Sequence, residues 1–148
     1  MERVRAEFES SPAKCQALLA GLPYLQKGFC RLCLLKPNKE GGYVQLSAEG
    51  ANKFAMLQEV LVWSRGVTER VLGEQCSHLC GNPLCLVAEH IIMESAKDNN
   101  NRKGCLVVGD CAHCPLKYLL CRHQPSCIIT VDGFASWEAF CENGIHNL

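Results

Sequence analysis

The stretch that decides the fold begins at Cys76, ends at Asn99 and reads CSHLCGNPLCLVAEHIIMESAKDN. Its spacing suits metal binding, because Cys80-x4-Cys85-x4-His90 offers three ligands that zinc accepts. A structural zinc ion takes four ligands in a tetrahedron, and Cys76 is the nearest candidate for the fourth. The stretch therefore predicts a loop that is pinned by one zinc ion.

The same stretch holds two polar residues that this zinc ion does not need. His78 carries an imidazole ring, which exchanges a proton near neutral pH. Asn99 offers a hard amide oxygen, which suits magnesium better than zinc. Together with the zinc-pinned loop, they predict a hydrolytic site with His78 and Asn99 as catalytic residues. The plainer alternative is a histidine that merely neighbours the zinc and an asparagine that starts a helix.

A second set of ligands follows along the chain. Cys121-x-His123-x3-Cys127 repeats the mixture of cysteine and histidine, and Cys105 upstream completes a Cys3His set. Two such sets predict two structural zinc ions, in preference to reduced cysteines packed in an apolar core.

Two Cys-x2-Cys pairs remain, namely Cys30 with Cys33 and Cys111 with Cys114. If the pairs meet in space, they form a four-cysteine site for a third zinc ion. His113 lies inside the second pair and could take the place of a cysteine. The sequence alone leaves the third ion open.

Composition favours an ordered protein in a reducing compartment. The chain has 148 residues, of which 48% are hydrophobic, so we expect one folded domain. Its 12 cysteines would indicate disulfides in a secreted protein. The first residues, MERVRAEFE, are charged and lack the apolar stretch of a signal peptide. We therefore expect an intracellular protein, nuclear or cytoplasmic, with zinc-bound thiolates and no membrane-spanning segment.

Charge leaves the question of nucleic-acid binding open. The formal net charge is +0, although binding to phosphates needs local positive charge. Basic residues do occur near the motif, and the set consists of Lys97, Arg102, Lys103, Lys117 and Arg122. They either form a basic face or are scattered, solvated side chains.

Local signals predict the elements around the motif. We expect a helix over 11–21, with Ser11 as its N-cap, a strand over 43–47 and a buried helix over 51–64. Residues 68–94 should form two short strands with the metal-pinned loop between them.

The remaining elements follow the motif. A short helix should begin after Ser95, and residues 104–127 should be loop-like. A strand is predicted over 128–131 and a helix over 136–143.

These elements divide the chain into three expected parts. Residues 1–66 form an N-terminal part with helices and a strand, 67–128 form the zinc-bound core, and 129–148 form a tail with a strand and a helix.

The motif resembles a known family, the His-Cys box homing endonucleases, which are intron-encoded members of the His-Me finger (ββα-metal) nuclease superfamily. The resemblance covers about a third of the chain, from Cys76 to Cys127. It rests on the run from Ser77 to Cys80, Asn82-Pro83-Leu84, Cys85, His90, Glu94-Ser95, Asn99, Cys105 and the Cys-x-His-x3-Cys run.

The resemblance implies a small α+β domain of the zinc-stapled ββα-metal type, with short flanking helices. It implies a magnesium-dependent DNA endonuclease, dimeric as in the family, in which His78 is the general base and Asn99 holds the divalent ion. Two zinc sites are implied as well. One uses Cys80, Cys85, His90 and a cysteine from earlier in the chain, and the other uses Cys105, Cys121, His123 and Cys127.

The chain also departs from the family pattern. The family braces the phosphate with an arginine that precedes the box, but no arginine lies between Leu35 and Ser64. Lys53, Gln45 or Arg65 could substitute for it. Residues 106–120 look like an insertion between zinc ligands. These departures favour the rival interpretation, a non-catalytic zinc module that binds nucleic acid or protein.

Overall fold

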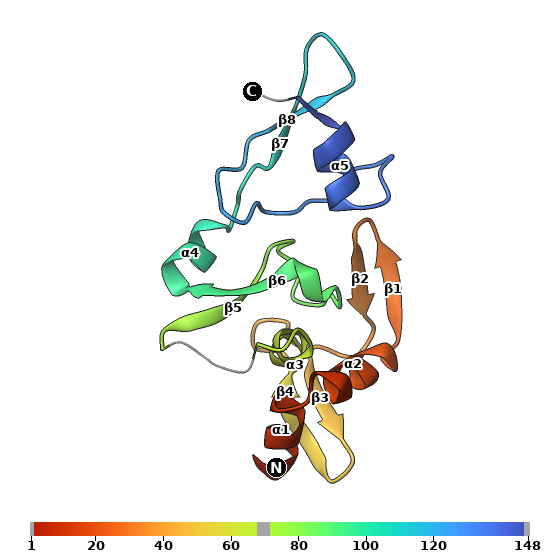
Figure 1. The fold of residues 1–148 in the computed structure, drawn as a ribbon, viewed down its shortest axis with the longest axis vertical. Coiled ribbons are helices and arrows are strands. Elements are labelled where there is room, and N and C mark those ends of the chain that lie inside the picture. Colours follow the sequence, from red (N-terminus) through yellow and green to blue (C-terminus); the bar gives the residue numbers. More distant parts are fainter. Residues whose placement is uncertain (1, 68–71, 147–148) are drawn as a thin grey trace.

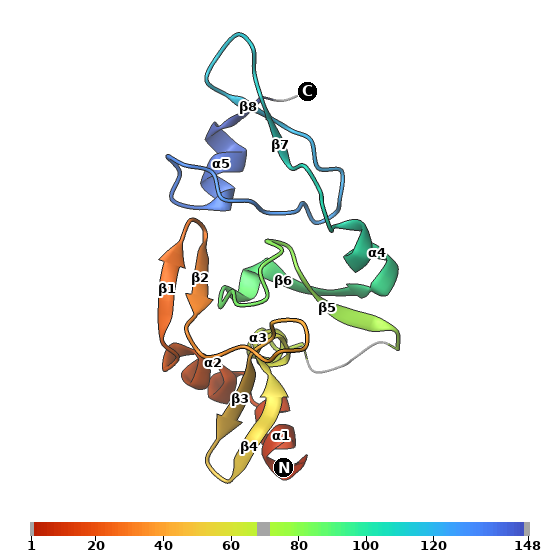
Figure 2. The same cartoon turned by 180° about the vertical axis from the view of Figure 1, so that it is seen from behind.

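The computed structural model describes residues 2–67 and 72–146. The molecule is elongated (Figure 1), with the N-terminal helices and the β3–β4 hairpin at one end and β7, β8 and α5 at the other. The antiparallel pair β5–β6 and helix α4 lie between the two ends, and the view from behind shows the same order (Figure 2). Among the described residues, no helix has the length and apolar character needed to cross a bilayer.

The N-terminal helices are α1 (Glu2–Glu9) and α2 (Pro12–Ala20). The prediction for 11–21 is confirmed, because the Ser11 hydroxyl accepts a hydrogen bond from the Lys14 amide and Gly21 caps the other end. A hairpin of β1 (Tyr24–Lys27) and β2 (Cys30–Cys33) follows.

The predicted helix over 51–64 is wrong in its first half. Residues Ala51–Met56 form strand β4, which pairs antiparallel with β3 (Gln45–Ala48), and only Leu57–Ser64 form helix α3. The sequence turns at Gly50, whose φ of 85° suits glycine, and the turn starts a hairpin instead of a helix. Helix α3 is buried nearly all round, as the sequence predicted.

The motif forms a β-β-α unit. Strand β5 (Glu74–His78) pairs antiparallel with β6 (Ile91–Ser95), and the metal-rich loop with the short 3-10 turn Ala88–His90 lies between them. Helix α4 (Ala96–Asn101) follows, capped by the Ser95 hydroxyl, which accepts from the Asp98 amide. These predictions are confirmed, except that 68–71 lie outside the described residues.

The C-terminal part is less regular than predicted in one place and more regular in another. The strand predicted over 128–131 is wrong, because these residues pair with no neighbouring strand in the described part of the chain, although Ile128 and Val131 are buried and the Ile128 amide donates to the Leu79 carbonyl. The expected loop 104–127 contains two strands, β7 (Val108–Asp110) and β8 (Lys117–Leu119). Strand β9 (Ile145–His146) pairs parallel with β8. Helix α5 (Trp137–Asn143) is confirmed, with Ser136 as its cap.

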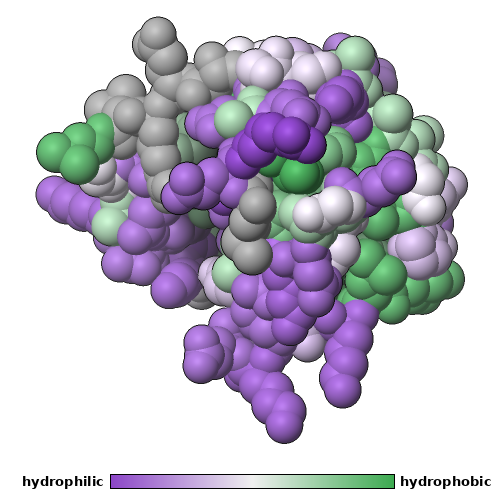
Figure 3. Space-filling model, turned by 90° about the horizontal axis from the view of Figure 1, so that it is seen from below, coloured by the Kyte–Doolittle hydropathy of each residue, from purple (hydrophilic) through white to green (hydrophobic). Residues whose placement is uncertain are grey.

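Two clusters of buried residues support these elements. The first core packs α1, α2 and α3 against the β3–β4 hairpin and includes Phe54, Leu57, Leu61 and Trp63. Seen from below, this end of the molecule is mostly hydrophilic, with hydrophobic side chains gathered along one side (Figure 3). The second core lies at the other end and includes Trp137 and Phe140. The expectation of a small α+β domain with Cys/His clusters is confirmed.

Candidate functional site

The first Cys/His group consists of Cys30, Cys80, Cys85 and His90, whose ligand atoms lie within 4.8 Å of one another. His90 Nδ1 lies 3.6 Å from the Cys30 sulfur and 3.5 Å from the Cys85 sulfur. A sulfur and a nitrogen on one tetrahedral zinc ion are about 3.6 Å apart, given ordinary Zn–S and Zn–N bond lengths. The donor set and the spacing therefore both fit zinc.

The fourth member of this group is Cys30. The prediction that Cys76 is the fourth ligand is therefore wrong. Cys76 lies in extended strand β5, so its backbone is about 6–7 Å from that of His78 and further from the loop. Its sulfur lies 3.6 Å from the sulfur of Met93 instead. Cys30 arrives from the β1–β2 hairpin, which is bonded to the loop by Cys33 N–H to Leu84 C=O at 2.8 Å. A cysteine from earlier in the chain is what the family resemblance implied.

The sulfurs of this group are crowded enough to share protons. Hydrogen bonds that Cys30 donates to Cys80 and Cys85 raise the pKa of Cys30, whereas hydrogen bonds that Cys85 accepts from Cys30 and Cys80 lower the pKa of Cys85. One thiol thus keeps its proton so that its neighbour can ionise. A divalent cation among them would allow all three to be thiolates.

The second group brings together Cys105, Cys121, His123 and Cys127, the four residues that the sequence grouped. His123 Nδ1 lies 3.6 Å from the sulfur of Cys105, 3.3 Å from that of Cys121 and 3.5 Å from that of Cys127. The Cys121 sulfur also accepts hydrogen bonds from the backbone amides of His123 and Cys127, at 3.4 and 3.3 Å. The geometry again fits a tetrahedral zinc ion.

The two Cys-x2-Cys pairs do not meet. Cys30 belongs to the first group, and Cys33 is 3% exposed in the first core. Cys111 and Cys114 instead lie beside His146 from the end of the chain. Sequence reasoning missed His146, because a single histidine 32 residues beyond Cys114 gives no spacing signal.

His78 ends strand β5 and is mostly buried beside the first group. Its Nε2 atom is buried and has no hydrogen-bond partner among the described residues. Burial lowers the pKa of His78 below its ordinary value, with the Cys85 thiolate opposing this effect and His90 adding to it. Burial thus favours the neutral ring, in which one nitrogen has a lone pair that can accept a proton.

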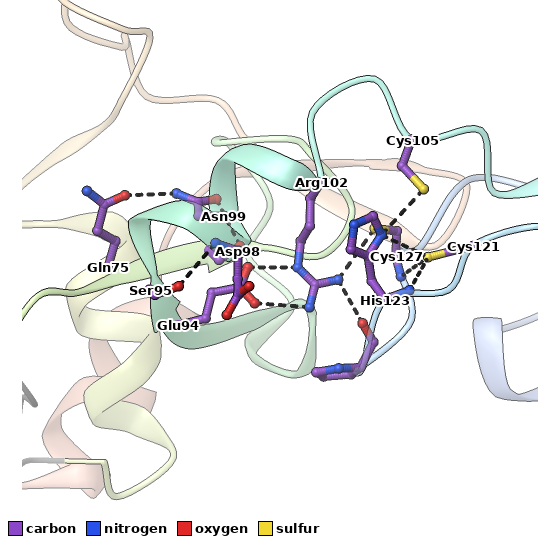
Figure 4. A network of polar contacts seen from close by, with 12 residues as sticks. Gln75, Glu94, Ser95, Asp98, Asn99, Arg102, Cys105, Cys121, His123 and Cys127 are labelled. Carbon is purple, nitrogen blue, oxygen red and sulfur yellow. Dashed lines mark hydrogen bonds and ion pairs between the residues drawn. The ribbon is translucent and has the colours of Figure 1, made fainter.

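Asn99 lies on α4 and is held against β5. Its Oδ1 accepts a hydrogen bond from the Ser77 hydroxyl at 2.9 Å, and its Nδ2 donates to Gln75 Oε1 at 3.1 Å (Figure 4). The two contacts fix the orientation of the amide, and Oδ1 keeps a second lone pair. Asn99 and His78 both line a cleft of about 530 Å³, together with Lys103.

Arg102 joins the β-β-α unit to the second zinc group (Figure 4). Its guanidinium donates to both carboxylate oxygens of Glu94, at 2.7 and 3.0 Å, to the Pro125 carbonyl at 2.7 Å and to the Cys127 sulfur at 3.4 Å. Burial of Glu94 opposes ionisation, but the hydrogen bonds from Arg102 and Ser77 lower its pKa. Arg102 is thus fully engaged inside the protein.

The other basic residues near the motif are divided. Lys117 is paired with Asp110 at 2.5 Å, whereas Lys97, Lys103 and Arg122 are exposed. Of the five basic residues, Arg102 and Lys117 are therefore already paired with carboxylates, and three remain exposed.

The three candidates to replace the family's phosphate-bracing arginine do not line the cleft. Arg65 donates to the backbone carbonyls of Ala88 and Ile91. Lys53 and Gln45 belong to the β3–β4 hairpin, which points away from the β5–β6 pair (Figure 1). Among the described residues, Lys103 and the engaged Arg102 are the basic side chains that line the cleft.

Comparison with known proteins identifies a family but no individual relative. No curated protein and no solved structure gives a significant match to the chain. A family model described as the zinc-binding loop region of homing endonuclease matches residues 25–139, which is well over half of the 148 residues. The match includes every ligand of the first two Cys/His groups, which confirms the resemblance and the assignment of zinc. The chain therefore belongs to the family of the zinc-binding loop region of homing endonucleases.

Proposed function

We propose that the chain is a magnesium-dependent endonuclease that hydrolyses phosphodiester bonds of DNA. The observation that carries the proposal is that His78 and Asn99 line one cleft, where the His78 Nε2 has no hydrogen-bond partner among the described residues and the Asn99 amide oxygen is held in place. Membership of a homing endonuclease family supports a nuclease-related role.

His78 acts as the general base in this proposal. Its burial favours the neutral ring, in which a ring nitrogen can take a proton from a water molecule in the cleft. The ring lies where strand β5 meets the zinc-pinned loop, so the strand on one side and the loop on the other hold its backbone in place. A positioned general base is typically worth about 10²–10⁴-fold in rate.

Asn99 is the residue that would hold magnesium. Its amide oxygen is a hard donor, and Mg²⁺ commonly binds proteins through one or two oxygens while it keeps waters and phosphate oxygens as further ligands. When bound, the ion would supply Lewis-acid stabilisation of charge on the phosphate. Ser77 and Gln75 orient the Asn99 amide, which removes side-chain freedom before any ligand arrives.

DNA contacts must come from local positive charge, since the net charge of the chain is +0. Lys103 is exposed and lines the cleft, so it is our candidate for the phosphate contact that an arginine makes in the family. A lysine gives a point charge without the bidentate fork, and we therefore expect weaker bracing. We also propose a nuclear or cytoplasmic location, where thiolates stay reduced for zinc. The homodimer implied by the family resemblance stays a prediction.

The test is plasmid nicking by zinc-replete protein in magnesium or manganese, compared with EDTA-quenched reactions. We expect wild type to nick, His78→Ala to lose about 10²-fold or more, and Asn99→Ala to be inactive at low magnesium. Asn101→Ala is the matched control, because Asn101 is exposed on the same helix and lies outside the cleft lining.

Two outcomes would overturn the proposal. Equal nicking by wild type and His78→Ala would assign the activity to another site or to a contaminant. DNA binding without cleavage in any metal would leave the non-catalytic zinc module, which the neutral charge and the engaged Arg102 favour.

A further inference from the structure

The end of the described chain is attached to the β7–β8 hairpin by few contacts. Strand β9 is short, and the Lys117 amide donates to the Gly144 carbonyl at 3.0 Å just before it. The His146 ring lies against the Tyr118 ring, with centroids 5.3 Å apart. Such a short strand gains little from its own hydrogen bonds, and Ile145 packs against the second core, so a further interaction at His146 would strengthen the attachment.

His146 also faces the two cysteines of the hairpin. Its Nε2 lies 2.6 Å from the Cys114 sulfur, and the ligand atoms of Cys111, Cys114 and His146 all lie within 4.8 Å of one another. The three side chains are half-buried, so their ligand atoms are shielded but reachable. The family match ends at residue 139 and does not include His146.

The turn at Cys111 is built like the turn at a ligand of the second zinc group. The Cys111 sulfur accepts a hydrogen bond from the His113 amide at 3.4 Å, and the Cys121 sulfur accepts one from the His123 amide, also at 3.4 Å. In both cases the amide two residues later points at the sulfur. Such N–H donors favour the thiolate, which is the form that binds metal.

We propose that Cys111, Cys114 and His146 form a third zinc site, which fastens the C-terminal segment to the β7–β8 hairpin. Two thiolates and an imidazole are ligands that zinc prefers, and a three-residue set leaves the fourth position to solvent. The Tyr118 hydroxyl lies 3.7 Å from the Cys111 sulfur, where it can hydrogen-bond to a metal-bound thiolate. Binding would widen the Cys114–His146 contact by about 1 Å, to the spacing of two ligands on one tetrahedral ion.

This site differs from the first two in strength. It has three protein ligands instead of four, and all three are half-buried, whereas each of the other groups includes buried ligands. We therefore expect a competing chelator to remove this zinc ion before the other two.

Zinc counting tests the proposal without reference to DNA cleavage, so it can fail while the proposed nuclease activity stands. Native mass spectrometry of zinc-replete protein should show three zinc ions in wild type and two in Cys114→Ser and His146→Ala. His113→Ala is the matched control, since it alters an exposed residue of the same turn, and it should keep three.

A ligand exchange guards against variants that misfold. His146→Cys supplies a third thiolate, so it should restore the third ion and strengthen the sulfur-to-metal charge-transfer absorbance of the cobalt-substituted protein. If Cys114→Ser or His146→Ala loses all zinc, the variant has unfolded. The zinc content of His146→Cys then decides whether the third site exists. Two ions in zinc-replete wild type, three in His146→Ala, or a Cys111–Cys114 disulfide in the intact mass would each overturn the third site.

Discussion

The two buried clusters are held together by different forces. In the first core, Leu57, Val60 and Leu61 are completely buried, and Phe8 stacks against Phe54 with ring centroids 4.7 Å apart. In the second core the zinc ligands Cys121 and Cys127 are themselves among the buried residues. The first core is thus an ordinary apolar core, whereas the second is assembled around metal ligands.

Magnitudes explain why the second core can be so small. Burying one large apolar side chain contributes about 1.5–3 kcal/mol, whereas a structural zinc ion contributes roughly 10–16 kcal/mol in zinc-finger peptides. One ion therefore replaces several apolar side chains. The difference teaches that the 48% hydrophobic content misleads unless the ligand cysteines are counted separately.

Chelation should separate the two cores most clearly, and it has the largest expected effect. Removal of zinc by excess phenanthroline should abolish amide protection over 105–146, because binding and folding are coupled there. Helices α2 and α3 should keep part of their protection, since apolar packing holds them. The measurement is hydrogen exchange followed by mass spectrometry. Uniform loss of protection along the chain would mean that the cores are not separate units.

Arg102 should give the next largest effect, because it connects the β-β-α unit to the second zinc group. Arg102→Met leaves Glu94 buried and unpaired, which costs about 3–5 kcal/mol, measured by denaturant unfolding with zinc present. The double variant with Glu94→Gln should recover much of the loss, because no charge is then stranded. If the single variant is as stable as wild type, the contact carries no energy between the two halves.

The two helix caps offer a matched and smaller comparison. Ser11 caps α2 beside the first core, and Ser136 caps α5 beside the second. Ser11→Ala and Ser136→Ala should each cost about 0.5–2 kcal/mol, measured as shifts in the midpoint of denaturation. Similar losses would show that ordinary helix energetics apply in both halves. A much larger loss at Ser136 would mean that α5 limits the stability of the zinc-dependent core.

Local chemistry made much of this fold predictable. The caps at Ser11, Ser95 and Ser136 satisfy amides a few residues away, so their helices could be located from the sequence. The second zinc group could be assembled for a similar reason, since its four ligands lie between Cys105 and Cys127.

The predictions that failed depended on distant contacts. Cys30 and His146 reach their groups through hairpin and strand pairing that no spacing rule reports. The start of α3 was misplaced because Phe54 fits either a buried strand or a buried helix, and only pairing with β3 decides. His78 and Asn99 could be chosen by residue type, but the hydrogen bond between Ser77 and Asn99 required the fold.

The origin of Cys30 has a consequence for the order in which the protein assembles. Cys80, Cys85 and His90 are neighbours along the chain and can bind an ion together without distant contacts. Cys30 lies about 50 residues earlier in the sequence. Joining it to them closes a loop of that length, at an entropic cost of about 3.5 kcal/mol. The loop contains the whole of β3, β4 and α3, so the last coordination bond can form once these elements have packed. The fourth ligand of the first zinc site is therefore coupled to the packing of the N-terminal half, although the other three are neighbours along the chain.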